Sequence, residues 1–377
     1  MIKDKFNKLF FPNDNKTQHF KSLDGLRGIA VLLVLLSHSS NTKIFIHKTF
    51  DFHAVGKVGV YLFFVLSAYL LDRQIALAFM TKKSSIGYWK NYFLRRFLRI
   101  YPLFVIALIL HGLLNLAGIK TVIDRIIDIP LHMALLRGES IFWSIPVEFK
   151  YYLISPLIMW FCNKFLKWNA VKLFFVFILL ILTSIAIEVV FELPLVSTFK
   201  YFPIFLIGTM ISIYELLFKN YFKNNIEPKL FSITGLIAFA LILITIPFYF
   251  EKISGFKVNF HSPIFYFPYA FLWGIILLSA KYGKGIIKYV LELKFLRFIG
   301  VISFSLYLFH MLVLNYVKQA EIPTQFKFYT FFIISIVFAT VSYLIIERPL
   351  SKIKIYSNEI SEKDIKKRQP TPNKFNC

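Results

Sequence analysis

The chain has 377 residues, of which 57% are hydrophobic and 19% aromatic, and its mean hydropathy is +0.64. This composition excludes an ordinary soluble domain, which would carry more charge and far fewer than 45 Phe. The net charge of +24 does not indicate nucleic acid, because most of the 44 Lys and Arg fall in segments that alternating spans place on one side of a membrane.

Apolar runs of about twenty residues recur along the chain, and each is long enough to cross a bilayer as a helix. They predict an all-α, polytopic membrane bundle with both termini in the cytoplasm. About ten transmembrane helices are expected, at 24–43, 54–71, 99–118, 142–162, 172–192, 199–218, 229–250, 262–280, 297–317 and 327–346.

One membrane domain, residues 23–349, is predicted between a cytoplasmic segment at 1–22 and a cytoplasmic basic tail at 350–377 that we expect to be disordered. No cleavage pattern follows the first apolar run, so it is expected to be a retained anchor. The two cysteines, Cys162 and Cys377, give no disulfide framework and no metal-binding spacing.

The first span, LDGLRGIAVLLVLLSH (23–38), contains Arg27 and His38 eleven positions apart. On a helix they lie roughly 16 Å apart along the axis, about half the hydrocarbon thickness. Ionisable residues inside a membrane are costly and indicate a functional site. Each also has a simpler interpretation, an interfacial anchor for Arg27 and an interhelical hydrogen bond for His38.

The second and third spans contribute a small residue and a basic cluster. Ser67 lies in GVYLFFVLSAYL (59–70), where small residues permit close helix approach or leave room for a passage. Arg96 and Arg99, in YWKNYFLRRFLRIYP, share one helix face and are suited to bidentate phosphate binding. The alternative is that these arginines only set membrane topology.

Glu148 in FWSIPVEFKYYL and His310 in SFSLYLFH are predicted at the depth of His38, in the outer half of the membrane. A carboxylate and an imidazole at one depth can form a base with an orienting partner. Glu148 could instead face water in an interfacial helix. His111 and His132 are interpreted as interface or loop residues without a role.

These segments also resemble, in order, the motifs of the acyltransferase-3 family of bacterial membrane acyltransferases. The resemblance runs from about residue 20 to 349 and includes the Arg27–His38 spacing, Arg96-x-x-Arg99, and the segment with Trp143, Ser144 and Glu148. ISFSLYLFH and the closing IERP match the late helices, while Phe149 and Lys150 replace the family's usual second acidic residue and Gln. The chain is similar to stand-alone members, in which no SGNH-type esterase domain follows the last helix.

The resemblance implies an O-acetyltransferase of the bacterial inner membrane. It would take an acyl group from cytoplasmic acetyl-CoA, with no permanently bound cofactor or metal, to a hydroxyl of a carbohydrate such as lipopolysaccharide O-antigen or capsule. His38 and Glu148 are then the expected catalytic residues, and direct transfer and an acyl-histidine intermediate both stay open. The donor-binding residues would be Arg27, Arg96, Arg99 and Ser67, and the site-shaping residues Trp143, Ser144, Tyr307 and His310.

Three alternatives stay open at this point. The acceptor could be peptidoglycan, a periplasmic glucan, a lipid or a small molecule. The chain could also be a transporter of a polysaccharide precursor, although it lacks matched broken helices in two halves. A polysaccharide polymerase would be expected to have larger outer loops than 119–141. The sequence does not indicate an oligomeric state.

Overall fold

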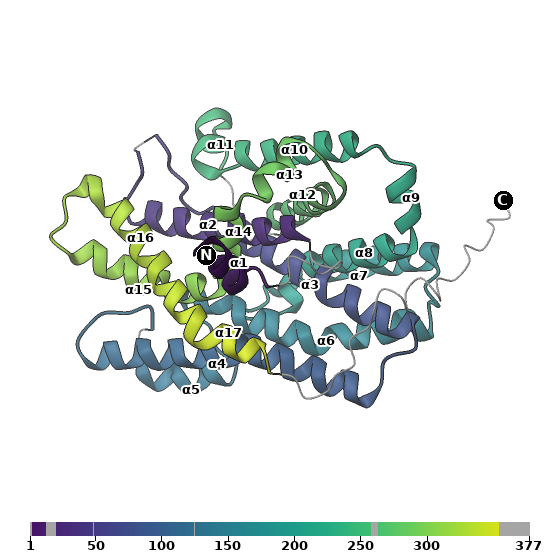
Figure 1. Ribbon diagram of the computed structural model, residues 1–377, viewed down its shortest axis with the longest axis horizontal. Helices are drawn as coiled ribbons and strands as arrows, with labels where there is room; N and C mark the ends of the chain where they lie inside the picture. Colours follow the sequence, from purple (N-terminus) through teal and green to yellow (C-terminus); the bar gives the residue numbers. More distant parts are fainter. Residues whose placement is uncertain (1, 13–19, 48, 124, 258–262, 354–377) are drawn as a thin grey trace.

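The computed structural model describes residues 2–12, 20–47, 49–123, 125–257 and 263–353. Within these ranges the fold is helical and contains no strand, as predicted (Figure 1). The elements are α1 (Ile2–Phe10), α2 (Lys21–Asn41), α3 (Gly56–Met80), α4 (Ile86–Leu116), η1 (Ile126–Asp128), α5 (Ile129–Met133), η2 (Ser140–Trp143), α6 (Ser144–Lys164), α7 (Ala170–Phe191), η3 (Phe199–Tyr201), α8 (Phe202–Leu217), α9 (Lys219–Asn224), α10 (Pro228–Ile244), α11 (Pro247–Ser254), α12 (Pro263–Tyr282), α13 (Ile286–Leu291), α14 (Lys294–Val301), α15 (Ser303–Gln319), α16 (Thr324–Ser342), the π-helical turn η4 (Tyr343–Glu347) and α17 (Arg348–Ser351).

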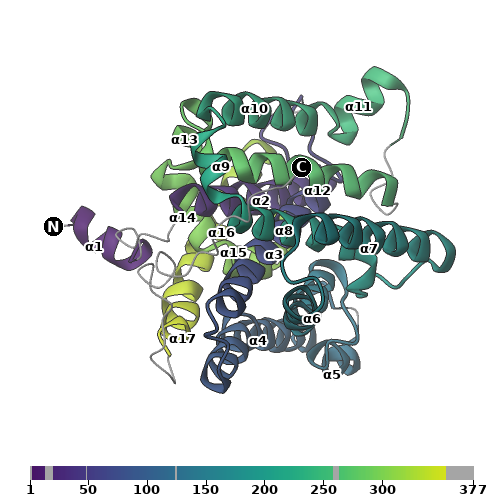
Figure 2. The ribbon, with the colours of Figure 1, turned by 90° about the vertical axis from the view of Figure 1, so that its right-hand side faces the viewer.

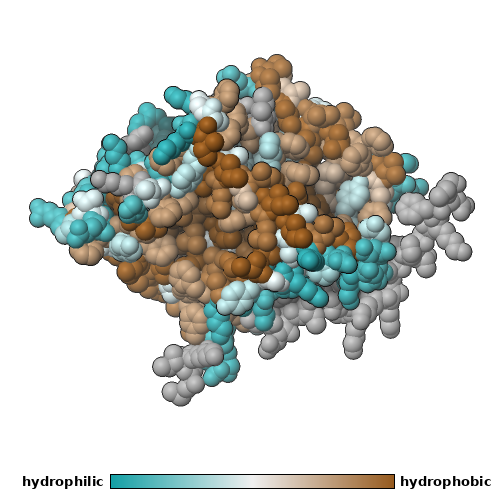
Figure 3. All heavy atoms as spheres, turned by 90° about the horizontal axis from the view of Figure 1, so that it is seen from above, coloured by the Kyte–Doolittle hydropathy of each residue, from teal (hydrophilic) through white to brown (hydrophobic). Residues whose placement is uncertain are grey.

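The helices are suited to a bilayer. Within the described ranges, six are long and apolar enough to cross it, and up to eight spans result if each of two bent pairs counts as one. Figure 3 shows a broad apolar band across the face seen from above, with hydrophilic residues gathered at its edges. An all-helical, multi-pass fold is therefore confirmed, whereas the count of about ten spans and the cytoplasmic position of both ends stay predictions.

Two predicted spans are broken helices. The run 229–250 forms α10 and α11, bent by 75°, and Pro247 begins the second helix. The run 297–317 forms α14 and α15, bent by 78°. Proline has no N–H for the bond to the preceding turn and suits the first position of a helix, which favours the first break. At the second break, Glu347 accepts hydrogen bonds from the backbone N–H and the hydroxyl of Ser305, and so satisfies a donor that the break leaves without an intrahelical partner.

The helix α2 runs through the middle of the bundle beside α3, α14 and α15 (Figures 1 and 2). Its close approach to α14 depends on glycine. A Cβ added to Gly300 would lie 1.8 Å from the carbonyl oxygen of Asp24, and one added to Gly28 would lie 2.2 Å from that of Leu296. Glycines on both helices therefore let the two backbones touch, and this contact fixes the position of Asp24 and Arg27.

The helix α3 continues nine residues beyond the predicted span end at 71, although the next residue is the buried Asp72. Its carboxylate accepts hydrogen bonds from the hydroxyls of Tyr151, Ser155 and Thr209. A buried charge is tolerated when neighbouring donors satisfy it. The extension thus follows from partners on α6 and α8 that local sequence does not reveal.

Candidate active site

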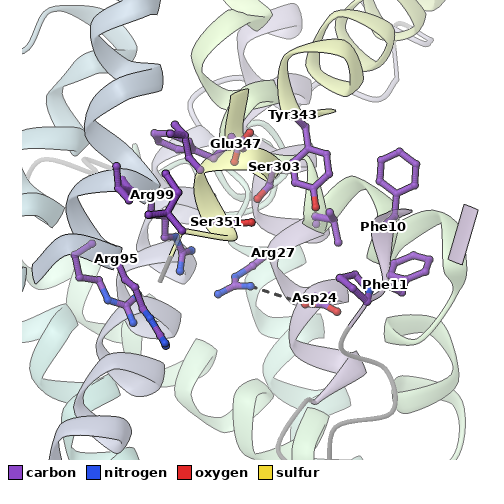
Figure 4. Close-up of a pocket in the computed structure, with 18 residues that line it drawn as sticks. Phe10, Phe11, Asp24, Arg27, Arg95, Arg99, Ser303, Tyr343, Glu347 and Ser351 are labelled. Atoms are coloured by element: carbon purple, nitrogen blue, oxygen red, sulfur yellow. Dashed lines mark ion pairs between the residues drawn. The ribbon is translucent and has the colours of Figure 1, made fainter. Parts of the chain in front are cut away.

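A cavity of about 430 Å³ opens between α1, α2, α4 and α14 on one part of its wall and the turn η4 and helix α17 on another. We call it the arginine cavity, because four arginines line it, namely Arg27, Arg95, Arg96 and Arg99. Figure 4 shows Arg95 and Arg99 on one side, Arg27 in the centre, and Phe10 and Phe11 on the opposite side. Its size is within the range of small-molecule and cofactor sites.

The arginines of this cavity differ in how they are held. Arg27 pairs with Asp24 at 3.8 Å, one turn earlier on α2. The guanidinium of Arg96 lies 5.7 Å from the ring centre of Tyr152, over its face, and donates to Gln74 at 3.4 Å. Arg95 and Arg99 are exposed and form no ion pair with any residue in the described part of the chain. These two charges remain available for an anion such as a phosphate.

A second, much smaller cavity of about 50 Å³ continues from the first. The two share Arg27, Arg99, Ser303 and Phe304, and we call the smaller one the neck. Residues from five helices, α2, α3, α4, α6 and α15, meet here. Beyond the shared residues the polar groups of the neck are Ser67, Ser144, Glu148 and Tyr307.

Glu148 has two hydrogen-bond donors at the neck. Its Oε1 accepts from the Ser67 hydroxyl and from the Tyr152 hydroxyl, each at 2.5 Å. Tyr152 follows one turn later on α6, so the helix itself supplies one of the two partners. The carboxylate is thereby fixed beside Arg27 and Arg99, which line the same neck.

His38 and His310 form a pair, with ring centres 5.1 Å apart. His310 is fully buried, and its Nδ1 lies 2.8 Å from the carbonyl oxygen of Tyr307 and 3.2 Å from that of Leu306. Both carbonyls only accept, so the neutral ring carries its proton on Nδ1 and Nε2 is left as an acceptor. That Nε2 is buried and has no hydrogen-bond partner among the described residues.

Tyr307 connects the neck with the histidine pair. Its hydroxyl donates to the carbonyl of Ile141 at 2.6 Å and lies 2.8 Å from the Ser144 hydroxyl, while its ring centre is 6.1 Å from that of His310. Arginine cavity, neck, Tyr307 and histidine pair thus follow one another through the bundle. The order matches the expected separation of a cationic end at Arg27 from a basic end at His38.

The expected pairing of Glu148 with His38 does not occur as a contact. Within the described residues, Glu148 bonds to Ser67 and Tyr152, whereas the ring of His38 packs beside that of His310. Equal depth in a membrane does not place two residues on facing sides of their helices, so depth alone could not decide this. Trp143 lies in the core, 4.8 Å from Tyr201 between ring centres, and does not line either cavity.

Two histidines for which the sequence predicts no role are also buried, both beside Phe142. His111 and His132 are fully buried, and their ring centres lie 5.2 Å and 6.1 Å from that of Phe142. None of their ring nitrogens has a hydrogen-bond partner among the described residues, although His132 lies 3.7 Å from Glu139. The signal in the sequence was a histidine inside the apolar run 99–118. No group of three or more metal-ligating side chains occurs in the described ranges.

Residues 20–347 match the sequence model of a family described as an acyltransferase domain. The chain is 24% identical over 373 residues to a protein of Staphylococcus aureus (strain COL) provisionally named an O-acetyltransferase, covering 91% of this chain and 59% of that protein. It is 25% identical over 371 residues to the O-acetyltransferase OatA of Staphylococcus aureus (strain NCTC 8325 / PS 47), covering 89% of this chain and 58% of that protein. The chain therefore spans less than two thirds of these curated relatives. No solved structure is a significant match.

Proposed function

The chain belongs to the acyltransferase-3 family, and on that premise we propose that it transfers an acetyl group from cytoplasmic acetyl-CoA, across the cytoplasmic membrane, to a carbohydrate hydroxyl. The acceptor that we propose is a surface polysaccharide such as lipopolysaccharide O-antigen or capsule. The observation that carries the proposal is the continuous arrangement of arginine cavity, neck and histidine pair within one helix bundle.

The arginine cavity is the proposed donor site. Arg95 and Arg99 are exposed cations without a carboxylate partner in the described ranges, and guanidinium groups bind phosphate oxygens in pairs. With both chain ends in the cytoplasm, this cavity opens to the cytoplasm, where acyl-CoA is made. The thioester arm is thin and uncharged, and it would pass between Arg27 and Arg99 into the neck.

The histidine pair is the proposed reaction site. The acceptor hydroxyl loses its proton to His38, its oxygen attacks the thioester carbonyl, and the carbon–sulfur bond breaks as the ester bond forms. The proton then passes from His38 to the departing thiolate, so the reaction is balanced without another reactant. An acyl-histidine route would divide the same bond changes into two steps.

We assign positioning roles to the groups around His38. His310 packs on the His38 ring, and its Nε2 can accept a hydrogen bond from the protonated imidazole. Glu148, held by Ser67 and Tyr152, would offset the charge of Arg27 and Arg99 where the donor passes. Tyr307 and Ser144 would border the passage from the neck to the reaction site.

A complementation experiment with two readouts tests the proposal. A deletion strain would be complemented with wild type, His38→Ala or His53→Ala, the control being a partly exposed histidine 3.2 Å from Asp51. We expect wild type and His53→Ala to restore the ester signals in NMR spectra of the surface polysaccharide, and His38→Ala to be inserted normally but inactive.

The second readout is CoA release from acetyl-CoA added to inverted membrane vesicles. Unchanged ester signals in the deletion strain would reject the polysaccharide acceptor, and vesicles that release no CoA would reject the donor. A fully active His38→Ala protein would remove His38 from the mechanism.

A further inference from the structure

The arginine cavity has two chemically different sides. The cationic side comes from α4 and α2, whereas the opposite side is aromatic and is formed by Phe10, Phe11 and Tyr343 (Figure 4). Phosphate recognition explains the first side only. The second side needs another explanation, because an aromatic wall contributes nothing to binding a phosphate.

The aromatic side comes from the end of α1 and from η4, and α14 packs behind it. Phe10 of α1 stacks on Tyr343 of η4, with ring centres 5.8 Å apart and an angle of 24° between ring planes. It also meets Phe298 of α14 edge-on at 4.9 Å. The guanidinium of Arg297 lies 4.3 Å above the ring of Phe11. These contacts hold the short helix α1 against the cavity.

Membrane anchoring does not account for these rings. An amphipathic helix at a bilayer surface presents its aromatic residues to lipid. Phe10 and Phe11 are each only 6% exposed, and both line the cavity. Among the side chains of this helix that the structure describes, the exposed ones, Asp4 and Lys8, are charged. These two rings therefore border the cavity and do not face lipid.

We propose that Phe10, Phe11 and Tyr343 form a subsite for the purine base of the acyl donor, across the cavity from the arginines that take its phosphates. This inference rests on the proposed function and specifies its donor as a nucleotide thioester. Bases stack on aromatic side chains wherever nucleic acids are held without base-specific contacts, and arginines beside them bind the phosphates. A pantetheine thioester carried on a protein has a phosphate but no base, and would leave this side of the cavity unused.

The test compares three probes on the purified full chain, namely CoA, adenosine 3′,5′-bisphosphate and 4′-phosphopantetheine. The variant Phe10→Leu with Phe11→Leu keeps apolar side chains but removes the stacking rings. We expect it to bind CoA and the bisphosphate about tenfold more weakly, with phosphopantetheine binding unchanged. Phe10→Tyr with Phe11→Tyr keeps the rings and should bind as wild type. Phe231→Leu, a buried phenylalanine of α10 outside both cavities, is the control for a general packing defect.

Each other outcome has a definite meaning. Equal weakening for all three probes indicates a collapsed cavity and overturns the base subsite, as does unchanged affinity for the bisphosphate. A wild-type protein that binds phosphopantetheine but not the bisphosphate also overturns the subsite and leaves the donor cavity standing. A wild-type protein that binds none of the three removes the proposed donor as well.

Discussion

The contact between α2 and α14 gives the sharpest stability prediction, through the substitution Gly300→Ala. The new Cβ would lie 1.8 Å from the carbonyl oxygen of Asp24 and 3.1 Å from the backbone nitrogen of Gly28. To restore an ordinary contact of 3.4 Å between the Cβ and that oxygen, the two backbones must move apart by about 1.6 Å. Neither helix can yield by rotating a side chain, because the atoms that Gly300 meets belong to the main chain.

The expected cost follows from two opposing effects. Overpacking a close-packed interior costs about 1–3 kcal/mol, and a clash with backbone falls at the upper end, about 3 kcal/mol. Replacing helical glycine by alanine returns about 1 kcal/mol of helix propensity. The net loss is therefore about 2 kcal/mol, enough to lower the folded-to-unfolded ratio about thirtyfold. Arg27 and Asp24 also move with α2, so donor affinity should fall together with stability.

Thermal unfolding in detergent measures the effect, with CoA binding recorded on the same samples. Gly56→Ala is the matched control, because its nearest contacts are the Cβ and Oγ of Ser37 at 3.2 Å and not a carbonyl oxygen; it should lower the free energy of unfolding by no more than about 1 kcal/mol, less than Gly300→Ala does. Gly300→Ala protein as stable as wild type would refute the backbone contact between α2 and α14.

Three further results are expected. Tyr307→Phe removes the hydroxyl that joins Ser144 to the Ile141 carbonyl. It should lower the free energy of unfolding by about 2 kcal/mol and slow acyl transfer. A transfer rate and an unfolding midpoint equal to those of wild type would contradict a role for this hydroxyl. Arg99→Ala should raise the KM for acetyl-CoA about tenfold, with Arg99→Lys in between, whereas an unchanged KM would leave Arg99 a purely topological role. Asp128 lies between α4 and α6, and a hydrogen bond from Arg125 lowers the pKa of its carboxyl group. The ionised carboxylate therefore stabilises the fold above the unfolded-state pKa of about 3.9. This stabilisation is lost as the pH falls through the lower pKa of the folded state. Asp128→Asn should thus melt below wild type at pH 7 but not at low pH, and a gap that persists in acid would contradict this.

The parts of the fold that local pattern determines were predictable from the sequence. The run containing Arg27 and His38 forms the single helix α2, and the arginines of α4 lie on a face that lines a cavity. Length and hydrophobicity decide such features, since a helix in lipid must satisfy its own backbone. The roles of these residues in catalysis stay predictions.

The arrangement of partners was not predictable in the same way. The neighbours of Glu148 and His38 depend on how α3, α6 and α15 are rotated about their axes, and helix rotation is set by packing between distant segments. The bend before α15 involves Glu347, more than forty residues later. A hydropathy pattern contains neither kind of information. It predicts how deep a residue lies in the membrane, but not which neighbouring helix its side chain faces.

Under the proposed function, the small size of the neck would also limit ion flow across the membrane. A space of about 50 Å³ holds no more than one or two water molecules, and it separates the far larger arginine cavity from the histidine pair. A hydrated ion does not pass such a constriction, and neither does a nucleotide. Under the proposed function, this constriction would block ion flow while a small acyl group is transferred, and long-chain acyl groups would be refused at the same place.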